Sequence, residues 1–470
     1  MLASLAACGS TGESGETTAD SGSSETSAEK PEYEYPALDF GGRDFVFLMT
    51  DSQRNTQRID VEMTGSVLDD AIYERNRVIE ERFNVNLVQT PGTTYDKVNS
   101  LLRSSVMAGD DEYQVAFPLT DGMASLITDG LVWNLNESEY FQFDQPWWDQ
   151  AIMADASIGE DGAVYFASSN IYLHNFEMSW CIYFNRRMVT DLGLELPYQT
   201  VLDGKWTYDR LYEYASAGHN LNGDDSYAFN KDGSCVYGFA SMNDCVYQSF
   251  VSCGEKFIDM NGGDPVLTLG SDRFYTIADK LAKLYGEEGV SHFGNDRNSG
   301  SHYENVYAAG RAMFLGAEIK GGNAFGMFSE MQDDYGIIPM PKLDEAQENY
   351  ISPVAVYTFF MMIPMTNDNL DETAQLLDAM AYLSYKNVVP AYYDITLTVK
   401  NIRDDETVDM LNIIRDTRTY LTCYALGWGN SFRSELSSKL RSGSSDLAST
   451  IATHKTTIES EISKTLEAIK

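Results

Sequence analysis

The residue types that could do chemistry in this chain favour recognition of a solute over catalysis. The sequence lacks the G-x-S-x-G, H-E-x-x-H and G-x-x-x-x-G-K-[ST] motifs, and its 5 His residues are scattered. It contains 29 Tyr and 6 Trp, which combine a flat apolar ring with a polar group. Rings of this kind stack on apolar faces while short polar neighbours form hydrogen bonds, so the composition predicts a wet binding cleft.

The 71 Asp and Glu residues leave one catalytic alternative open. A pair of carboxyl groups about 5 Å apart, or about 6.5–9.5 Å apart, would suit a glycoside hydrolase. Sequence spacing does not give that distance, so a surface glycoside hydrolase stays as the alternative to a binding protein. We expect no enzyme activity and no cofactor.

One loop carries oxygen ligands at the spacing that begins a calcium-binding loop. Asn220, Asn222 and Asp224 supply these oxygens. Asp225 stands where such a loop needs glycine, and Lys231 stands where it needs a bidentate Glu. The favoured interpretation is a polar surface loop without metal, and calcium is the weaker candidate.

The N-terminal residues predict a lipid anchor. Leu5-Ala6-Ala7-Cys8 matches a bacterial lipobox, so residues 1–8 are interpreted as the remnant of a lipoprotein signal peptide that ends in the acylated Cys8. Residues 9–32 are rich in Ser, Thr, Gly and Glu and predict a disordered tether. No later stretch is apolar enough to span a bilayer. We therefore expect an extracytoplasmic protein that is lipid-anchored to the bacterial cell membrane.

The charge balance excludes some partners. The formal net charge is −38, which repels nucleic acid and disfavours strongly anionic solutes.

The cysteines other than Cys8 are odd in number, so they cannot all pair with one another. The alternatives are one disulfide among Cys235, Cys245 and Cys253, or buried free thiols. These cysteines are Cys181, the cluster Cys235, Cys245 and Cys253, and Cys423.

Alternating strands and helices must position any site. A strand at 44–49, a helix at 68–83, a strand at 85–89, a helix at 95–107 and a strand at 113–118 predict a parallel sheet covered by helices. Ligands bind beyond the carboxyl ends of such strands, here residues 50–53 and 119–123. Further strands are expected at 162–166, 180–185, 312–315 and 335–338, and further helices at 187–192, from Thr207, at 373–383 and at 447–469.

Several segments, in order, resemble family 1 extracellular solute-binding proteins, the maltodextrin- and oligosaccharide-binding group. The most specific runs from Cys181 to Leu194, reads CIYFNRRMVTDLGL, and is followed by Pro197 and Lys205-Trp206-Thr207. It is similar to the family's strand that delivers Tyr and Asn to a helix stopped by Gly. Weaker matches are AGRAMFLG at 309–316, YGIIPMPK at 335–342, and the element from Tyr113 to Leu135.

The resemblance implies an α/β fold of the periplasmic-binding-protein type II kind. Two discontinuous α/β lobes would be joined by a hinge, with the ligand cleft between them. Carried over to this chain, lobe 1 would comprise 33–166 and 308–355, and lobe 2 would comprise 167–307 and 356–470. The crossings would lie near 166–169, 302–309 and 353–359.

The resemblance also implies the function and the residues that serve it. The chain would be the substrate-binding component of an ABC importer, a monomer that delivers a carbohydrate, in the form of an oligosaccharide, to permease subunits. A non-transport sensor or a peptide binder would share this fold. The expected ligand-binding residues are Asp51, Gln53, Asp121, Gly122, Ser169, Asn170, Tyr172 and Glu318, with Trp147, Trp148, Tyr357 and Trp428 as stacking rings.

Overall fold

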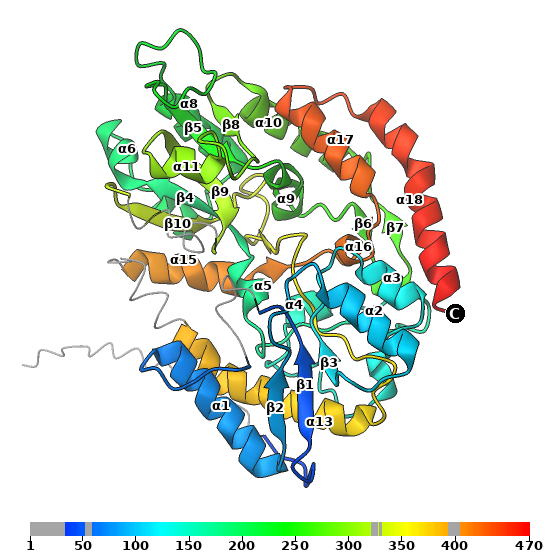
Figure 1. Cartoon of the computed structure of the whole chain (residues 1–470). Helices are drawn as coiled ribbons and strands as arrows, with labels where there is room; N and C mark the ends of the chain where they lie inside the picture. Colours follow the sequence, from blue (N-terminus) through cyan, green and yellow to red (C-terminus); the bar gives the residue numbers. More distant parts are fainter. Residues whose placement is uncertain (1–32, 52–58, 321–327, 329–330, 393–404) are drawn as a thin grey trace, which may run out of the picture. The chain divides into compact units, whose positions relative to one another are not determined.

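The computed structural model describes residues 33–51, 59–320, 328, 331–392 and 405–470. The chain divides into two compact units, Met1–Glu34 and Tyr35–Lys470. The expected signal peptide, Cys8 and the whole of the expected tether lie outside the described residues, as does Gln53. The fold is therefore that of Tyr35–Lys470 (Figure 1).

The first sheet is parallel, as the alternation of strands and helices predicted. It contains β1 (Asp44–Leu48), β2 (Asn86–Gln89) and β3 (Val115–Ala116) in the order β2-β1-β3. Helix α1 (Val67–Phe83) begins where the Ser66 side chain accepts a hydrogen bond from the Asp69 amide, and it buries an apolar stripe that includes Ile72 and Ile79. Helices α2 (Val98–Ala108), α3 (Met123–Thr128) and α13 (Leu370–Leu383) complete this lobe.

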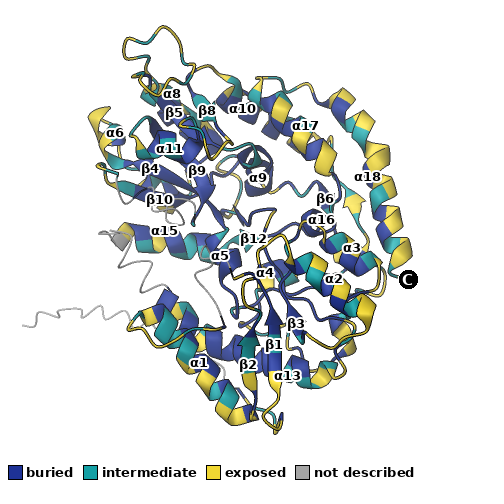
Figure 2. Ribbon diagram, viewed as in Figure 1, coloured by how far each residue is buried: buried dark blue, intermediate teal, exposed yellow. Residues whose placement is uncertain are grey.

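The second sheet is mixed. Its order is β10-β4-β9-β5-β8, and β4 runs antiparallel to both β10 and β9. All residues of the two central strands, β4 (Trp180–Asn185) and β9 (Ala312–Glu318), are buried, because helices cover both faces. Figure 2 shows these strands in dark blue. The other strands are β5 (Tyr237–Ser241), β8 (Ser291–Phe293) and β10 (Tyr335–Pro339).

The segment that carries the closest family resemblance folds as expected. The Asn185 side chain ends β4 and accepts a hydrogen bond from the Met188 amide at 3.0 Å, which starts α6 (Arg186–Asp191). Thr207 likewise caps α8 (Tyr208–Gly218). Gly336 on β10 must lack a side chain, because a Cβ there would lie 2.3 Å from the Phe184 ring and from the Tyr198 hydroxyl.

The lobe partition that we predicted differs from the strand pairing. Strands β9 and β10 pair with β4, so residues 312–318 and 335–339 belong to the second lobe, whereas we placed 308–355 in the first. Conversely, residues 359–364 form bridges with first-lobe residues, among them Ala116↔Met362, and α13 packs on α1. Both lobes contain apolar strands, so the local sequence of a strand does not reveal which sheet it joins.

We expected three crossings, near 166–169, 302–309 and 353–359. Residues 167–179 and 354–359 lead from one sheet to the other. The third, near 302–309, is instead helix α11 (Tyr303–Ala308), which packs on β9 and β5 inside the second lobe. The strand expected at 162–166 is reduced to an isolated bridge between Ile158 and Ala163.

C-terminal helices extend the second lobe. Helix α17 (Asn430–Arg441) packs on α9 (Asp244–Ser252) and α10 (Asp272–Gly286), while α18 (Ala448–Ala468) contacts α17 and, in the first lobe, α3. The remaining elements are α4 (Gln150–Met153), α5 (His174–Glu177), α7 (Tyr198–Leu202), α15 (Asp405–Asp416), α16 (Thr422–Ala425), β6 (Ile258–Asp259), β7 (Val266–Leu267), β11 (Ser352–Pro353) and β12 (Arg418–Thr419), with helical turns at Leu135–Glu137, Asn261–Gly263 and Ser384–Val388.

The described residues bear on two further expectations. Within them, no helix has the length and apolarity needed to cross a bilayer. Of the two cysteine alternatives, the structure has the second: Cys181, Cys235, Cys245, Cys253 and Cys423 are all buried free thiols. Burial raises the pKa of the Cys245 thiol to about 11 and that of the Cys423 thiol to about 12, so both are inert.

Candidate functional site

The two crossing segments are held side by side by buried hydrogen bonds. The Ala355 amide donates to the Met178 carbonyl at 2.9 Å. The Asn175 side chain donates to the Ser168 hydroxyl at 2.8 Å and accepts from the Thr358 hydroxyl. These groups have their partners inside the crossings, so they fix the geometry between the lobes.

Thr120 attaches the end of the first sheet to the same crossing. Its hydroxyl donates to the Val356 carbonyl at 2.6 Å and accepts from the Thr358 amide at 3.1 Å. This brings Asp121 and Gly122 beside Tyr357. Gly122 has φ 95 and begins α3, a conformation that a side chain would strain.

A pocket lies where these segments meet the C-terminal helices. It holds about 280 Å³ of empty space, part of it open to solvent. The first lobe, the crossing and the second lobe all contribute to its lining, which consists of Thr120, Asp121, Gly122, Ala124, Val356, Tyr357, Tyr424, Ala425, Gly427 and Asn430. We call this the crossing pocket.

The crossing pocket offers two tyrosines of different character. Tyr357 is 54% exposed. Tyr424 is buried, yet its hydroxyl has no hydrogen-bond partner among the described residues. An exposed ring face and an unsatisfied buried hydroxyl suit a ligand that stacks and accepts or donates a hydrogen bond.

Arg433 holds the second-lobe side of the pocket. Its guanidinium lies 4.4 Å from the centre of the Tyr424 ring and donates to the Trp428 carbonyl at 3.1 Å. A further guanidinium nitrogen donates to the Asn430 side-chain oxygen. The Asn430 amide group therefore remains available as a donor at the pocket.

The second lobe contains the buried carboxyl groups Glu304 and Glu318, and Asp244 begins its helix α9. Burial raises the pKa of the Tyr357 phenol, and the negative charges of Asp244 and Asp121 raise it further. Burial raises the pKa of Glu318 to about 8 and that of Glu304 to about 7. Glu318 is the last residue of β9. The amide of the next residue, Ile319, donates to the Ser179 carbonyl, and Ser179 forms a bridge with Val354, so Glu318 lies at the end of the sheet that faces the crossings.

The predicted site residues fall into three groups. Asp121, Gly122 and Tyr357 come together in the crossing pocket. Asp51 is exposed at the carboxyl end of β1, where its carboxylate accepts from the Gly92 amide at 3.0 Å. The third group lies in or beside the crossings. Ser169, Tyr172 and Glu318 are buried there, and the Asn170 side chain donates to the Trp147 carbonyl at 3.2 Å.

The structure gives three of the four expected stacking rings a packing role. Trp147 and Trp148 are buried, and both indole N–H groups donate to the Asp378 carboxylate, at 2.9 and 2.7 Å. Trp428 is also buried, and its indole donates to the Thr465 hydroxyl at 3.0 Å. The glycines beside Trp428 do form a loop, but that loop turns the ring inward.

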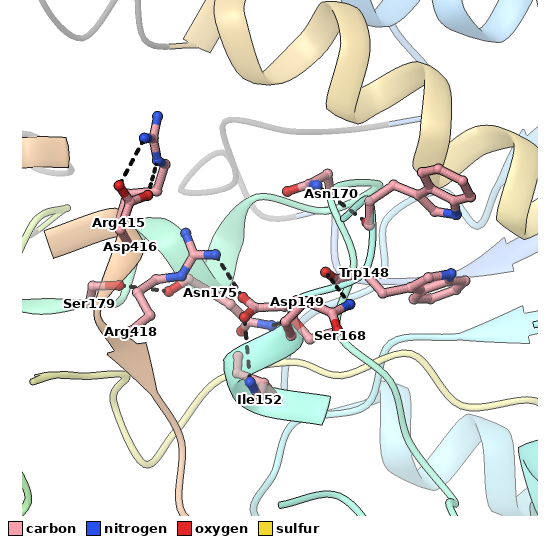
Figure 3. Close-up of polar contacts among 12 residues, drawn as sticks. Trp148, Asp149, Ile152, Ser168, Asn170, Asn175, Ser179, Arg415, Asp416 and Arg418 are labelled. Atoms are coloured by element: carbon pink, nitrogen blue, oxygen red, sulfur yellow. Dashed lines mark hydrogen bonds and ion pairs between the residues drawn. The ribbon is translucent and has the colours of Figure 1, made fainter. Parts of the chain in front are cut away.

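A buried ion pair lies beside Trp148 in the crossing region (Figure 3). The Asp149 carboxylate caps α4 through the Ile152 amide and pairs with Arg418 of β12 at 2.8 Å. Asp149 follows the first-lobe loop, whereas β12 pairs with β11 at the other crossing. The pair therefore ties the first-lobe loop to β12, which adjoins the second crossing.

The calcium-like loop satisfies its carboxylate internally. Asp224 accepts from the amides of Ser234 and Cys235, both at 2.7 Å, and Asn220 accepts from Asn222. Within the described part of the chain, no cluster of three metal-binding side chains occurs. The polar-loop interpretation accounts for these contacts.

Sequence reasoning did not name Tyr424 and Asn430, which line the pocket, or Asp244, and it gave Thr120 only as part of the strand end at 119–123. The glycine pair at 427 and 429 signalled a loop there, but Trp428 drew attention away from its neighbours. Asp244 begins α9 directly after β5, and a carboxylate that follows a strand was a usable signal.

Comparison with solved structures finds the same fold in bacterial solute-binding proteins. The chain aligns with a cyclic alpha-maltosyl-1,6-maltose binding protein from Arthrobacter globiformis at TM-score 0.59 and 10% identity, covering 89% of this chain and 98% of that chain. An ABC substrate-binding protein from Listeria monocytogenes in complex with cycloalternan aligns at TM-score 0.53 and 13% identity, covering 89% and 98%.

A third similar structure is UgpB from Mycobacterium tuberculosis in complex with glycerophosphocholine. Its TM-score is 0.54 at 15% identity, and the alignment covers 88% of this chain and 99% of that chain. Neither a protein-family model nor a curated protein sequence matches the chain. These structures confirm the predicted two-lobed α/β fold of the periplasmic solute-binding kind.

Proposed function

We propose that the protein is the substrate-binding component of a bacterial ABC importer and that it binds a carbohydrate, in oligosaccharide form, at the crossing pocket. The observation that carries this proposal is the pocket itself, which is lined by both lobes and the crossing in a fold shared with solute-binding proteins. The exposed Tyr357 ring would stack on a sugar face, and Asp121, Tyr424 and Asn430 would bond to its hydroxyls.

The proposed cycle is capture and release without turnover. The lobes would separate at the crossings to admit the solute, and closure would bury it between Asp121 on one side and Tyr424 on the other. The ligand shifts this equilibrium only by the difference in its affinity for the two forms. ATP hydrolysis would belong to other subunits.

The remaining parts of the proposal concern location and partners. The lipobox at Cys8 would anchor the chain to the outer face of the cell membrane, and the permease subunits would receive the solute. The protein would act as a monomer. A sensor that presents the ligand to another membrane protein is the competing role on the same fold, and the absence of permease genes beside this gene would favour it.

A thermal-shift screen of the full chain tests the binding function. The panel contains monosaccharides, oligosaccharides, peptides and amino acids, each at a large excess. Binding to the native state at 100 times Kd should stabilise it by about 2.7 kcal/mol. A shift with one glycan class supports the proposal, whereas a shift with peptides alone would contradict the carbohydrate assignment.

Incubation with a glycan panel tests the enzyme alternative. A binding protein leaves each glycan intact, because capture makes and breaks no glycosidic bond. Release of reducing ends in proportion to protein concentration would instead support a glycoside hydrolase.

A further inference from the structure

We infer that Glu461 and Thr465 of helix α18 are positioning residues of the crossing pocket, because they hold the loop that forms its second-lobe wall. This inference rests on the proposed binding function and deepens it. Neither residue is among those that line the pocket, so both would act through the residues that do.

The second-lobe wall of the pocket contains a short loop between α16 and α17. Gly427 of this loop and Asn430, the first residue of α17, line the pocket together with Tyr424 and Ala425 of α16. Gly427 and Gly429 have φ values of 70° and 73°, in the left-handed region that favours glycine. Because glycine restricts the backbone least, contacts with other elements must fix the position of this loop.

Two side chains of α18 bond to the middle of the loop. The Thr465 hydroxyl accepts a hydrogen bond from the Trp428 indole at 3.0 Å. The Glu461 carboxylate accepts a hydrogen bond from the Gly429 amide at 2.9 Å. Residues four apart lie on one face of a helix, so α18 presents both acceptors to the loop together.

The bond to Gly429 also supplies what the start of α17 lacks. Gly429 is the N-cap of α17 and has no side chain that could accept a hydrogen bond from the first turn. The Glu461 carboxylate binds the Gly429 amide and places a negative charge at the positive end of α17. Glu461 therefore helps to fix Asn430, the next residue, whose side chain lines the pocket.

The bond to Trp428 lies in the protein interior. Trp428 is 1% exposed and Thr465 is 6% exposed. The Thr465 hydroxyl donates to the Glu461 carbonyl at 3.1 Å, which orients its oxygen as the acceptor for the indole. Without this acceptor the buried indole N–H would lose its partner, which is costly, so the bond favours one orientation of the Trp428 ring.

Arg433 links the loop to the other pocket residues. Its guanidinium donates to the Trp428 carbonyl at 3.1 Å and to the Asn430 side-chain oxygen, and it lies 4.4 Å from the centre of the Tyr424 ring. A shift of Trp428 would therefore disturb the group that orients both Asn430 and Tyr424.

Helix α18 is itself fixed to both lobes (Figure 1). In the second lobe, His454 and Thr450 of its first half form hydrogen bonds with Glu435 of α17 at 2.9 and 2.7 Å. In the first lobe, α18 contacts α3, whose residue Ala124 lines the pocket on the opposite side. The helix thus holds the loop at a set distance from the first-lobe wall, so Glu461 and Thr465 influence the width of the pocket.

Hydrogen exchange of the full chain without solute tests the positioning role. Glu461→Ala and Thr465→Val each remove one acceptor, and amides of residues 424–430 should then exchange at least about tenfold faster. Glu461→Gln and Thr465→Ser keep an acceptor oxygen and should restore slow exchange. Glu467→Ala and Thr457→Val alter exposed residues of the same helix and should leave the loop unchanged. Unchanged exchange of the loop in both acceptor variants would overturn the inference.

Calorimetric titration then tests the consequence for binding. The probes are maltotetraose, cellotetraose, N-acetylchitotetraose and any compound that gives a thermal shift in the screen. Glu461→Ala and Thr465→Val should each weaken binding of the compound that the wild type binds by about fivefold, and the two conservative variants should restore it. Trp428→Phe removes the donor of the Thr465 bond, so Trp428→Phe/Thr465→Val should bind no more weakly than the weaker single variant.

The outcomes separate this inference from the function on which it rests. Binding by the wild type, with unchanged affinity in both acceptor variants, would overturn the inference and leave solute binding intact. Additive losses from Trp428→Phe and Thr465→Val would also contradict it, because the two residues would then act independently. No binding of any tetrasaccharide or of any member of the thermal-shift panel would overturn the binding function, and with it the role of α18 in binding.

Discussion

Two regions of this protein combine aromatic rings with an aspartate, and they differ in whether the polar groups are satisfied. At Asp378, the two indoles of Trp147 and Trp148 both donate to one buried carboxylate. At the crossing pocket, Asp121 and the Tyr424 hydroxyl face open space, and Tyr357 is exposed. Satisfied groups hold the fold together, whereas unsatisfied groups at a pocket are available to a ligand.

The largest effect should come from the satisfied region. Asp378→Ala leaves two buried indoles and the Gln142 amide without their acceptor, and should lower the free energy of unfolding by about 3–5 kcal/mol. Denaturant unfolding measures this loss. Asp161→Ala serves as the exposed control and should change stability by less than about 0.5 kcal/mol. A loss below about 1 kcal/mol for Asp378→Ala would remove the contrast between the regions.

A smaller effect, on pH dependence, should mark the unsatisfied acids. Burial raises the pKa of Glu304 to about 7 and that of Glu318 to about 8, from an ordinary value of 4.5. Each of these two carboxyl groups therefore binds its proton more tightly in the folded state than in the unfolded chain. Their contribution to stability is complete below pH 4.5 and is lost as pH rises through 7 and 8.

The measurement for this prediction is denaturant unfolding between pH 5 and pH 8.5. The wild type should lose roughly 2–4 kcal/mol more than the double variant Glu304→Gln/Glu318→Gln, which has no such protons to release. The comparison with the variant removes the general effect of the net charge of −38. Parallel curves for the two proteins would contradict the assignment of these acids.

The ion pair in the crossings should have an intermediate effect on stability. Asp149→Asn keeps an oxygen for the α4 cap but weakens the pair with Arg418, so we expect a loss of about 1–2 kcal/mol. Chemical unfolding measures it. Arg77→Gln, which breaks the exposed pairs with Glu74 and Glu81, is the control and should cost less. Equal losses would show that the crossing pair has no special role.

The smallest change in stability should come from Tyr424→Phe. Its hydroxyl has no partner among the described residues, so its removal should alter the free energy of unfolding by less than about 0.5 kcal/mol. Affinity for the solute found in the screen should nevertheless fall several-fold. Calorimetry and denaturant unfolding of the same sample check both halves, and a destabilised variant with normal affinity would reverse the interpretation.

Local sequence predicted the elements whose determinants are local. The stripe Leu68, Ile72, Ile79 and Phe83 gave α1, and the oxygens of Asn185 and Thr207 marked the starts of α6 and α8. Polar residues after strands also pointed to Asp121 and Gly122, which line the crossing pocket. These signals require only a few neighbouring residues.

Features that depend on distant pairing escaped prediction. Strands β9 and β10 were placed in the wrong lobe because only hydrogen bonding to β4 decides their sheet. Trp148 was taken as a stacking ring because its acceptor, Asp378, lies 230 residues further along the chain. Tyr424 was missed for the same reason, because the pocket that it lines is assembled from three segments that lie far apart in the sequence.

The most direct test of the binding site is a calorimetric titration of the solute from the screen against the wild type and Tyr357→Ala. Tyr357 is 54% exposed, so its loss should leave stability nearly unchanged. We predict that affinity falls at least tenfold while the free energy of unfolding stays within about 0.5 kcal/mol of the wild type. Unchanged affinity in a folded Tyr357→Ala variant would contradict binding at the crossing pocket.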